Sequence, residues 1–99
     1  MEKRKPHYNL NAIKTQMSDV EAMHLTMVAR HGIKCLGITA EEALRVVQSL
    51  SSDCFYKAMT VHADNRIWQD VYHAEWKAKG LYIKFQQGKE FFIVSFKER

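Results

Sequence analysis

Residues 81–97 read Leu81-Tyr-Ile-Lys-Phe-Gln-Gln-Gly-Lys-Glu-Phe-Phe-Ile-Val-Ser-Phe-Lys97. Apolar and polar side chains alternate on both sides of a polar turn, a pattern that predicts a β-hairpin with one buried face. A loop at 87–88 would pair Tyr82 with Ile93 and Lys84 with Phe91, and it would leave Lys97 on the face of Tyr82. The opposite face is wholly apolar, so we expect it to pack beneath helices. That face holds Leu81, Ile83, Phe85, Phe92, Val94 and Phe96.

Period-two patterning continues upstream of this hairpin. It predicts strands at 54–60, 66–75, 80–86 and 90–97, with turns at 63–66, 77–80 and 87–89. An even loop between the middle strands places Gln69 and His73 on the face of Tyr82. The same loop puts Trp68, Asp70 and Tyr72 on the core side, where the Asp70 carboxylate needs a partner or an edge position.

The first strand joins the same polar face through an odd loop, which adds Phe55, Lys57 and Met59. Polar side chains outside a half-buried sheet are ordinarily a solvated surface, and that interpretation stays open. The alternative is a basic platform for an RNA strand, with lysines on phosphates and aromatic rings on bases. The predicted polar face gathers Lys57, Gln69, His73, Tyr82, Lys84, Ser95 and Lys97.

The aromatic residues divide the chain into two halves, because ten of the eleven follow Cys54. Helical spacing and capping residues predict helices near 9–17, 26–36 and 39–50, while 19–25 is ambiguous and could hold a short edge strand. Helices first and strands second indicate an α+β domain over residues 1–99. We expect N-terminal helices packed on one face of a C-terminal antiparallel β-sheet.

Composition narrows the function classes. Fifteen basic and eleven acidic residues give a net charge of +4, which favours a polyanionic partner. No stretch approaches the roughly 18–20 apolar residues of a membrane span, and no secretory signal follows the charged start. The two cysteines, Cys35 and Cys54, form no CxxC motif and are too few for a disulfide scaffold or a zinc ribbon. They are typical of thiols in a reducing cytosol. We therefore expect a cytoplasmic protein without a membrane partner.

The residues of the polar face are suited to one reaction. The sequence has no motif of a catalytic nucleophile. It has no phosphate-binding loop and no dinucleotide-binding fingerprint, so we expect no cofactor. His24 and His31 have no convincing third metal ligand, so we expect no metal. Metal-free RNA cleavage remains feasible, because the substrate's own 2′-OH is the nucleophile. Lysine and tyrosine side chains can position the phosphate, move protons and stabilise the developing charge.

Several ordered motifs resemble the MqsR family of toxins. They are Phe55-Tyr-Lys-Ala-Met-Thr60, Ile67-Trp-Gln-Asp-Val-Tyr72, Leu81-Tyr-Ile-Lys84 and Ile93-Val-Ser-Phe-Lys-Glu98, together with the opening Met1-Glu-Lys-Arg4 and Pro6-His7. The resemblance implies a RelE-like fold and a type II toxin–antitoxin toxin. It further implies a metal-independent mRNA endoribonuclease that favours GCU sites and inhibits translation. The implied partners are mRNA and a zinc-containing antitoxin of the MqsA type, with no DNA binding except through that antitoxin.

The resemblance also assigns roles to residues of the polar face. It implies that Lys57, Gln69, Tyr82 and Lys97 are catalytic, and we predict His73, Lys84 and Tyr56 as substrate contacts. One departure is His73, since a member of the family has arginine there. Two function classes stay open: an mRNA interferase, or a degenerate module that binds RNA or antitoxin without cutting.

Some aromatic positions have a structural interpretation instead. Core packing is favoured for Tyr56 over substrate contact. We also predict that Trp68, Phe92, Val94 and Phe96 lie in the core. Loss of the Trp68 ring should then unfold the protein, at a cost of about 3–5 kcal/mol.

Overall fold

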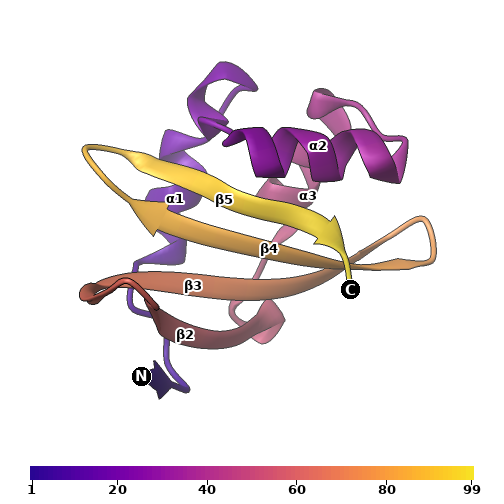
Figure 1. The fold of residues 1–99 in the computed structure, drawn as a ribbon. Coiled ribbons are helices and arrows are strands. Elements are labelled where there is room, and N and C mark those ends of the chain that lie inside the picture. Colours follow the sequence, from indigo (N-terminus) through magenta and orange to yellow (C-terminus); the bar gives the residue numbers. More distant parts are fainter.

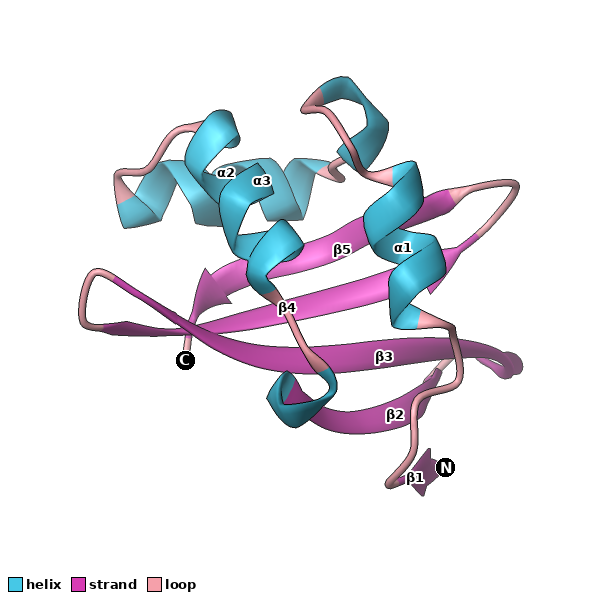
Figure 2. Ribbon diagram, turned by 180° about the vertical axis from the view of Figure 1, so that it is seen from behind, coloured by secondary structure: helices cyan, strands magenta, loops and turns pink.

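Five antiparallel strands form one sheet in the order β1-β2-β3-β4-β5. The computed structural model describes residues 1–99. The three α-helices cover one face of the sheet and no helix lies on the opposite face, which we call the open face (Figures 1 and 2). The strands are β1 Glu2–Lys3, β2 Phe55–Val61, β3 Asp64–Trp76, β4 Lys79–Gln87 and β5 Phe91–Glu98. The helices are α1 Leu10–Gln16, α2 Met27–Leu36 and α3 Ala40–Ser49, with 3₁₀ turns at Glu21–Met23 and Ser52–Cys54.

The helices begin where the sequence supplies capping side chains. Asn9 accepts a hydrogen bond from the backbone of α1, and Thr39 forms a capping box with Glu42 at the start of α3. The α2 helix ends at Gly37, which adopts the left-handed φ of 72° that glycine tolerates best. The α+β prediction and the three helix ranges are therefore confirmed to within a residue or two. The ambiguous 19–25 segment forms a 3₁₀ turn and a single bridge from Leu25 to Ile93.

The core lies between the helices and the sheet. Its aromatic centre is Tyr72 and Phe85, whose rings meet edge to face at 5.7 Å. The remaining buried members are aliphatic residues and one further phenylalanine. They are Ile13, Met17, Met23, Ala29, Ile33, Leu36, Ala43, Val46, Val47, Leu50, Leu81, Ile83, Ile93 and Phe96.

A β-bulge at Tyr56 corrects the predicted face of the first strand. Phe55 pairs with Tyr72 and Lys57 with Val71, so one extra residue stands between consecutive partners on β3. The extra residue turns Phe55 toward the helices, where its ring packs on Tyr72 at 5.5 Å. The prediction that Phe55 shares the polar face is wrong, whereas Lys57 stays on it.

A second bulge, at Val94, corrects the predicted hairpin register. Tyr82 pairs with Lys97 and Lys84 with Ser95, in place of the predicted partners on β5. The register then shifts so that Phe85 opposes Ile93, which is fully buried. Phe92 opposes Gln86 and is only half-buried. The prediction that Phe92 and Val94 are core residues is therefore wrong, and Ile93 fills that position.

The N-terminal segment packs across the sheet far from its neighbours in sequence. β1 pairs with β2, and the backbone N–H groups of His7 and Tyr8 donate to the two Asp70 carboxylate oxygens at 3.0 and 2.8 Å. These contacts supply the partner that a fully buried carboxylate requires. Trp68 stacks on the His7 ring at 5.2 Å and lies outside the core cluster, so its predicted core position is wrong.

None of the helices has the length and apolar character needed to cross a lipid bilayer.

Candidate functional site

Three predicted residues stand side by side across the middle of the open face. His73 of β3 pairs with Tyr82 of β4, and Tyr82 pairs with Lys97 of β5. Directly opposed residues on antiparallel strands share a face, so the three side chains form one row. The Lys97 ammonium lies 5.1 Å from the centre of the Tyr82 ring, within the range of a cation–π contact.

The adjacent rows add the other predicted residues. Lys57 and Lys84 both oppose Val71 of β3, one from each side. Gln69 follows in the next row and is nearly buried, with its Nε2 donating to Gln86 Oε1 at 2.8 Å. The structure thus brings together on one face all four residues predicted to be catalytic.

Burial and mutual repulsion set the charge behaviour of this lysine cluster. Burial lowers the pKa of Lys84, and the charges of Lys97 and Lys57 lower it further. Burial raises the pKa of Tyr82, while the Lys57 charge opposes that rise. A lysine with a lowered pKa gives up its proton more easily, so the cluster can both bind phosphate and exchange protons.

Tyr56 belongs to this face and not to the core. It is the extra residue of the β2 bulge, the residue is 44% exposed, and its ring stacks on His73 at 4.2 Å with an interplanar angle of 19°. The interpretation of Tyr56 as a core residue is therefore wrong. Two aromatic rings stacked at the surface offer a planar platform next to the lysines.

Three residues of the site were missed from the sequence. Gln86 orients Gln69, and Arg99 lies with its Nη1 2.8 Å from His73 Nδ1. Gln86 comes two positions after Lys84, and Arg99 comes two positions after Lys97. Because side chains alternate between the two faces of a strand, this spacing could have placed both residues on the open face. The third is Glu2, whose carboxylate forms an ion pair with the Lys57 ammonium at 3.2 Å. Only the fold brings Glu2 there, because the two residues are 55 positions apart.

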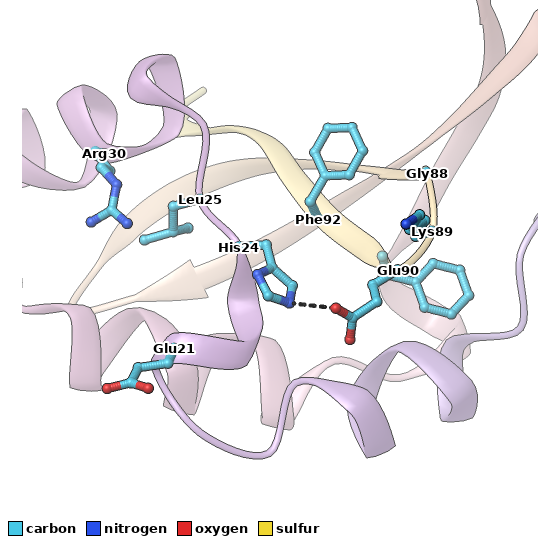
Figure 3. A pocket seen from close by; sticks show the side chains of 9 residues that line it. Glu21, His24, Leu25, Arg30, Gly88, Lys89, Glu90 and Phe92 are labelled. Carbon is cyan, nitrogen blue, oxygen red and sulfur yellow. Dashed lines mark ion pairs between the residues drawn. The ribbon is translucent and has the colours of Figure 1, made fainter.

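A separate hollow lies elsewhere, at the turn between β4 and β5. It encloses about 550 Å³ and contains an ion pair between His24 and Glu90 at 3.3 Å (Figure 3). None of the predicted site residues lines it, and its charged side chains are of both signs. No group of three or more histidine, cysteine or acidic side chains is arranged to hold a metal ion. The candidate site is therefore an open, basic sheet surface of the kind that accommodates an extended polyanion.

Comparison with known proteins agrees with this picture. The chain matches the family model described as "Motility quorum-sensing regulator, toxin of MqsA" over residues 5–98. It is 35% identical over 99 residues to the mRNA interferase toxin MqsR of Escherichia coli (strain K12), with 100% of each chain covered. The matches define the class of the protein as a toxin. The chain belongs to the MqsR toxin family, as its sequence motifs predicted.

Proposed function

We propose that this chain is an mRNA interferase: a metal-independent endoribonuclease that cuts mRNA at short GCU-like sites and thereby inhibits translation. The observation that carries the proposal is the row of His73, Tyr82 and Lys97, flanked by Lys57 and Lys84 on the same open face. The similarity to an mRNA interferase toxin over the full length of both chains supports it. A single-stranded substrate can lie across such a face because no helix covers it (Figure 1).

The reaction we propose is an in-line transfer of the scissile phosphoryl group within the RNA. The ribose 2′-oxygen attacks phosphorus, the bond from phosphorus to the 5′-oxygen breaks, and a 2′,3′-cyclic phosphate forms. One proton leaves the 2′-OH and one reaches the departing 5′-oxygen, so the products are a cyclic phosphate end and a 5′-OH end. The protein supplies alignment, proton transfer and positive charge, and the RNA supplies the nucleophile.

Each proposed role follows from a side chain's chemistry. Lys57 and Lys97 neutralise the phosphoryl oxygens, and one of the two acts as acid or base. Tyr82 lies between them and donates near the leaving oxygen or stacks on a base. The nearly buried Gln69, fixed by its hydrogen bond to Gln86, reads a base edge or orients the 2′-OH. Lys84 contacts a neighbouring phosphate.

The second proposed partner is a zinc-containing antitoxin of the MqsA type. Support comes from the family description, which names its members as toxins of MqsA. In such a pair the antitoxin neutralises the toxin, and DNA is reached only through the antitoxin.

Cleavage of a long protein-free mRNA in EDTA tests the proposed activity. Wild type should cut at a short consensus and leave 2′,3′-cyclic phosphate and 5′-OH ends, mapped by primer extension and end-specific ligation. Folded Lys97→Ala should not cut. Lys79→Ala is the matched control, because it removes a lysine from β4 at a position that alternates with Tyr82 and so faces away.

Each result of this experiment separates two functions. Loss of cutting in Lys97→Ala alone supports the interferase. If folded wild type leaves both naked and ribosome-bound mRNA intact, the chain is a module that binds RNA or antitoxin without cutting.

A further inference from the structure

We propose that Tyr56, His73 and Arg99 form a second nucleotide subsite, which binds the base and phosphate of an RNA residue next to the scissile one. The inference rests on the proposed function, since it extends the same open face. The ligand class is a single-stranded RNA nucleotide, bound by stacking and by one guanidinium–phosphate contact.

Arg99 has a fixed place at this subsite. Its backbone N–H donates to the Gly80 carbonyl oxygen at 2.8 Å, which continues the pairing of β5 with β4 past Lys97. Its side chain lies over Gly80: a Cβ there would stand 3.0 Å from Arg99 Nε and 3.4 Å from its Nη2. The guanidinium therefore occupies space that a larger residue at position 80 would fill.

The guanidinium keeps most of its hydrogen-bonding capacity free. Arginine has five N–H donors and no acceptor, so His73 Nδ1 must accept the 2.8 Å bond from Arg99 Nη1. The His73 ring is then neutral, and burial, with the Arg99 charge as a smaller cause, lowers the pKa of this ring. None of the four ion pairs in the molecule includes Arg99, although Asp53 and Glu75 line the same shallow hollow of about 280 Å³.

The stacked rings beside Arg99 complete the subsite. Tyr56 lies parallel to His73 at 4.2 Å, and the tilted Tyr82 ring follows at 6.1 Å from His73. This series of rings connects the exposed Tyr56 to the centre of the predicted active site. A base stacked on the exposed ring needs no sequence-specific hydrogen bond, because every base has an aromatic face.

Lys97 and Arg99 offer two separate cationic contacts on the open face. Their backbones are about 6.6 Å apart along β5, and the Arg99 guanidinium extends from there over Gly80 to His73 of β3. Two charges at different places on the face can contact two different phosphates of one RNA strand. With Lys97 at the scissile phosphate, Arg99 reaches the next one.

The test measures how salt weakens binding of a 2′-O-methyl RNA, which cannot be cut by attack of a 2′-OH. Fluorescence anisotropy gives Kd over a series of salt concentrations for wild type, Arg99→Gln and Lys79→Gln. Each phosphate contact on a single strand contributes about 0.7 to the slope of log K against log salt. Arg99→Gln should reduce the slope by about that amount, while Lys79→Gln, which removes an equal charge facing away, should not. Tyr56→Leu should keep the wild-type slope and lower the affinity about 5- to 150-fold through lost stacking.

The outcomes separate this proposal from the proposed activity. A slope for Arg99→Gln equal to that of wild type, or equal to that of Lys79→Gln, overturns the subsite even if wild type cuts mRNA. A slope that falls only in Arg99→Gln supports the subsite even if wild type fails to cut.

Discussion

The Lys57 ammonium forms an ion pair with the Glu2 carboxylate at 3.2 Å, so the N-terminal strand reaches into the candidate active site. Lys57 is largely covered, with 24% of its side chain exposed, whereas Glu2 is 59% exposed. A phosphate that binds Lys57 must therefore compete with a carboxylate that is already present. Through Glu2, the N-terminal strand therefore affects how tightly a phosphate binds to Lys57.

Replacing Glu2 by glutamine should tighten RNA binding. Exposed ion pairs contribute about 0.2–1 kcal/mol, so release of Lys57 should lower Kd by up to about fivefold at low salt. Anisotropy with 2′-O-methyl RNA at two salt concentrations measures the change. Glu41→Gln, in the first turn of α3, removes the same charge away from the open face and should have a smaller effect. Unchanged or weaker binding in Glu2→Gln would show that the carboxylate does not compete with phosphate.

Asp70→Asn should destabilise the protein, and more so in acid. The substitution replaces a buried acceptor of two backbone bonds, at a cost of about 1–3 kcal/mol. Burial raises the pKa of Asp70 above its ordinary 3.8, although the N–H groups of Tyr8 and His7 oppose the rise. The folded state therefore binds the proton more tightly than the unfolded state. This contribution to stability is complete below pH 3.8 and is lost as the pH rises through the folded-state pKa.

Urea unfolding at pH 4 and pH 7 measures this dependence. The difference in unfolding free energy between wild type and Asp70→Asn should be larger at pH 4. Equal differences at the two pH values would mean that the pKa of Asp70 is the same in both states.

Trp68→Ala should free the N-terminal segment and leave the core folded. The indole stacks on His7, and the Lys3 ammonium lies 4.2 Å from its ring centre, but Trp68 contributes nothing to the core cluster. We expect faster tryptic cleavage after Lys3 and Arg4 with a cooperative melting transition retained. Phe85→Ala is the comparison, because the fully buried Phe85 should cost about 3–5 kcal/mol. Equal losses of stability in the Trp68→Ala and Phe85→Ala variants would mean that Trp68 does contribute to the core.

The sequence predicts local features of this fold well. Helix boundaries follow from capping side chains at Asn9 and Thr39, which act within one helical turn. The α+β order follows from the concentration of aromatic residues after Cys54. Alternation within β4 and β5 placed Tyr82, Lys84 and Lys97 on one face, and the pairing of these strands agrees.

Contacts between distant segments could not be predicted in this way. A bulge inserts one extra residue into a strand, and no particular residue type marks its place in the sequence. The bulges at Tyr56 and Val94 were therefore not predicted, and they put Phe55 and Ile93 on the face opposite to the predicted one. The Asp70 carboxylate signalled the need for a partner but not which one. Its partners, the His7 and Tyr8 amides, lie more than 60 positions away and are backbone groups that every residue has.

Lys84→Arg should preserve RNA binding at alkaline pH. Because burial and the neighbouring lysines lower the pKa of Lys84, its charge is lost below the usual 10.5, and a phosphate contact is lost with it. Arginine stays charged throughout. Between pH 7 and pH 10, Kd for 2′-O-methyl RNA should rise in wild type more than in Lys84→Arg.

Loss of folding at alkaline pH would not explain the weaker RNA binding of wild type. A lysine whose pKa is lower in the folded state adds to stability as the pH rises through that pKa. Parallel pH profiles for the two proteins would indicate that Lys84 does not contact the RNA.

Gln86→Leu should lower kcat although Gln86 is not proposed to touch the reacting atoms. Gln69 Nε2 donates to Gln86 Oε1 at 2.8 Å, and this bond fixes the rotation of a nearly buried amide. Without it the Gln69 side chain can turn, and misalignment by about 1 Å can cost on the order of 100-fold in rate. We expect kcat on a short RNA substrate to fall by about 10- to 100-fold with little change in KM. Gln87→Leu is the control, since Gln87 is the next residue of β4 and points to the other face. A rise in KM alone, or an equal fall of kcat in both variants, would mean that Gln86 does not position Gln69 for the reaction.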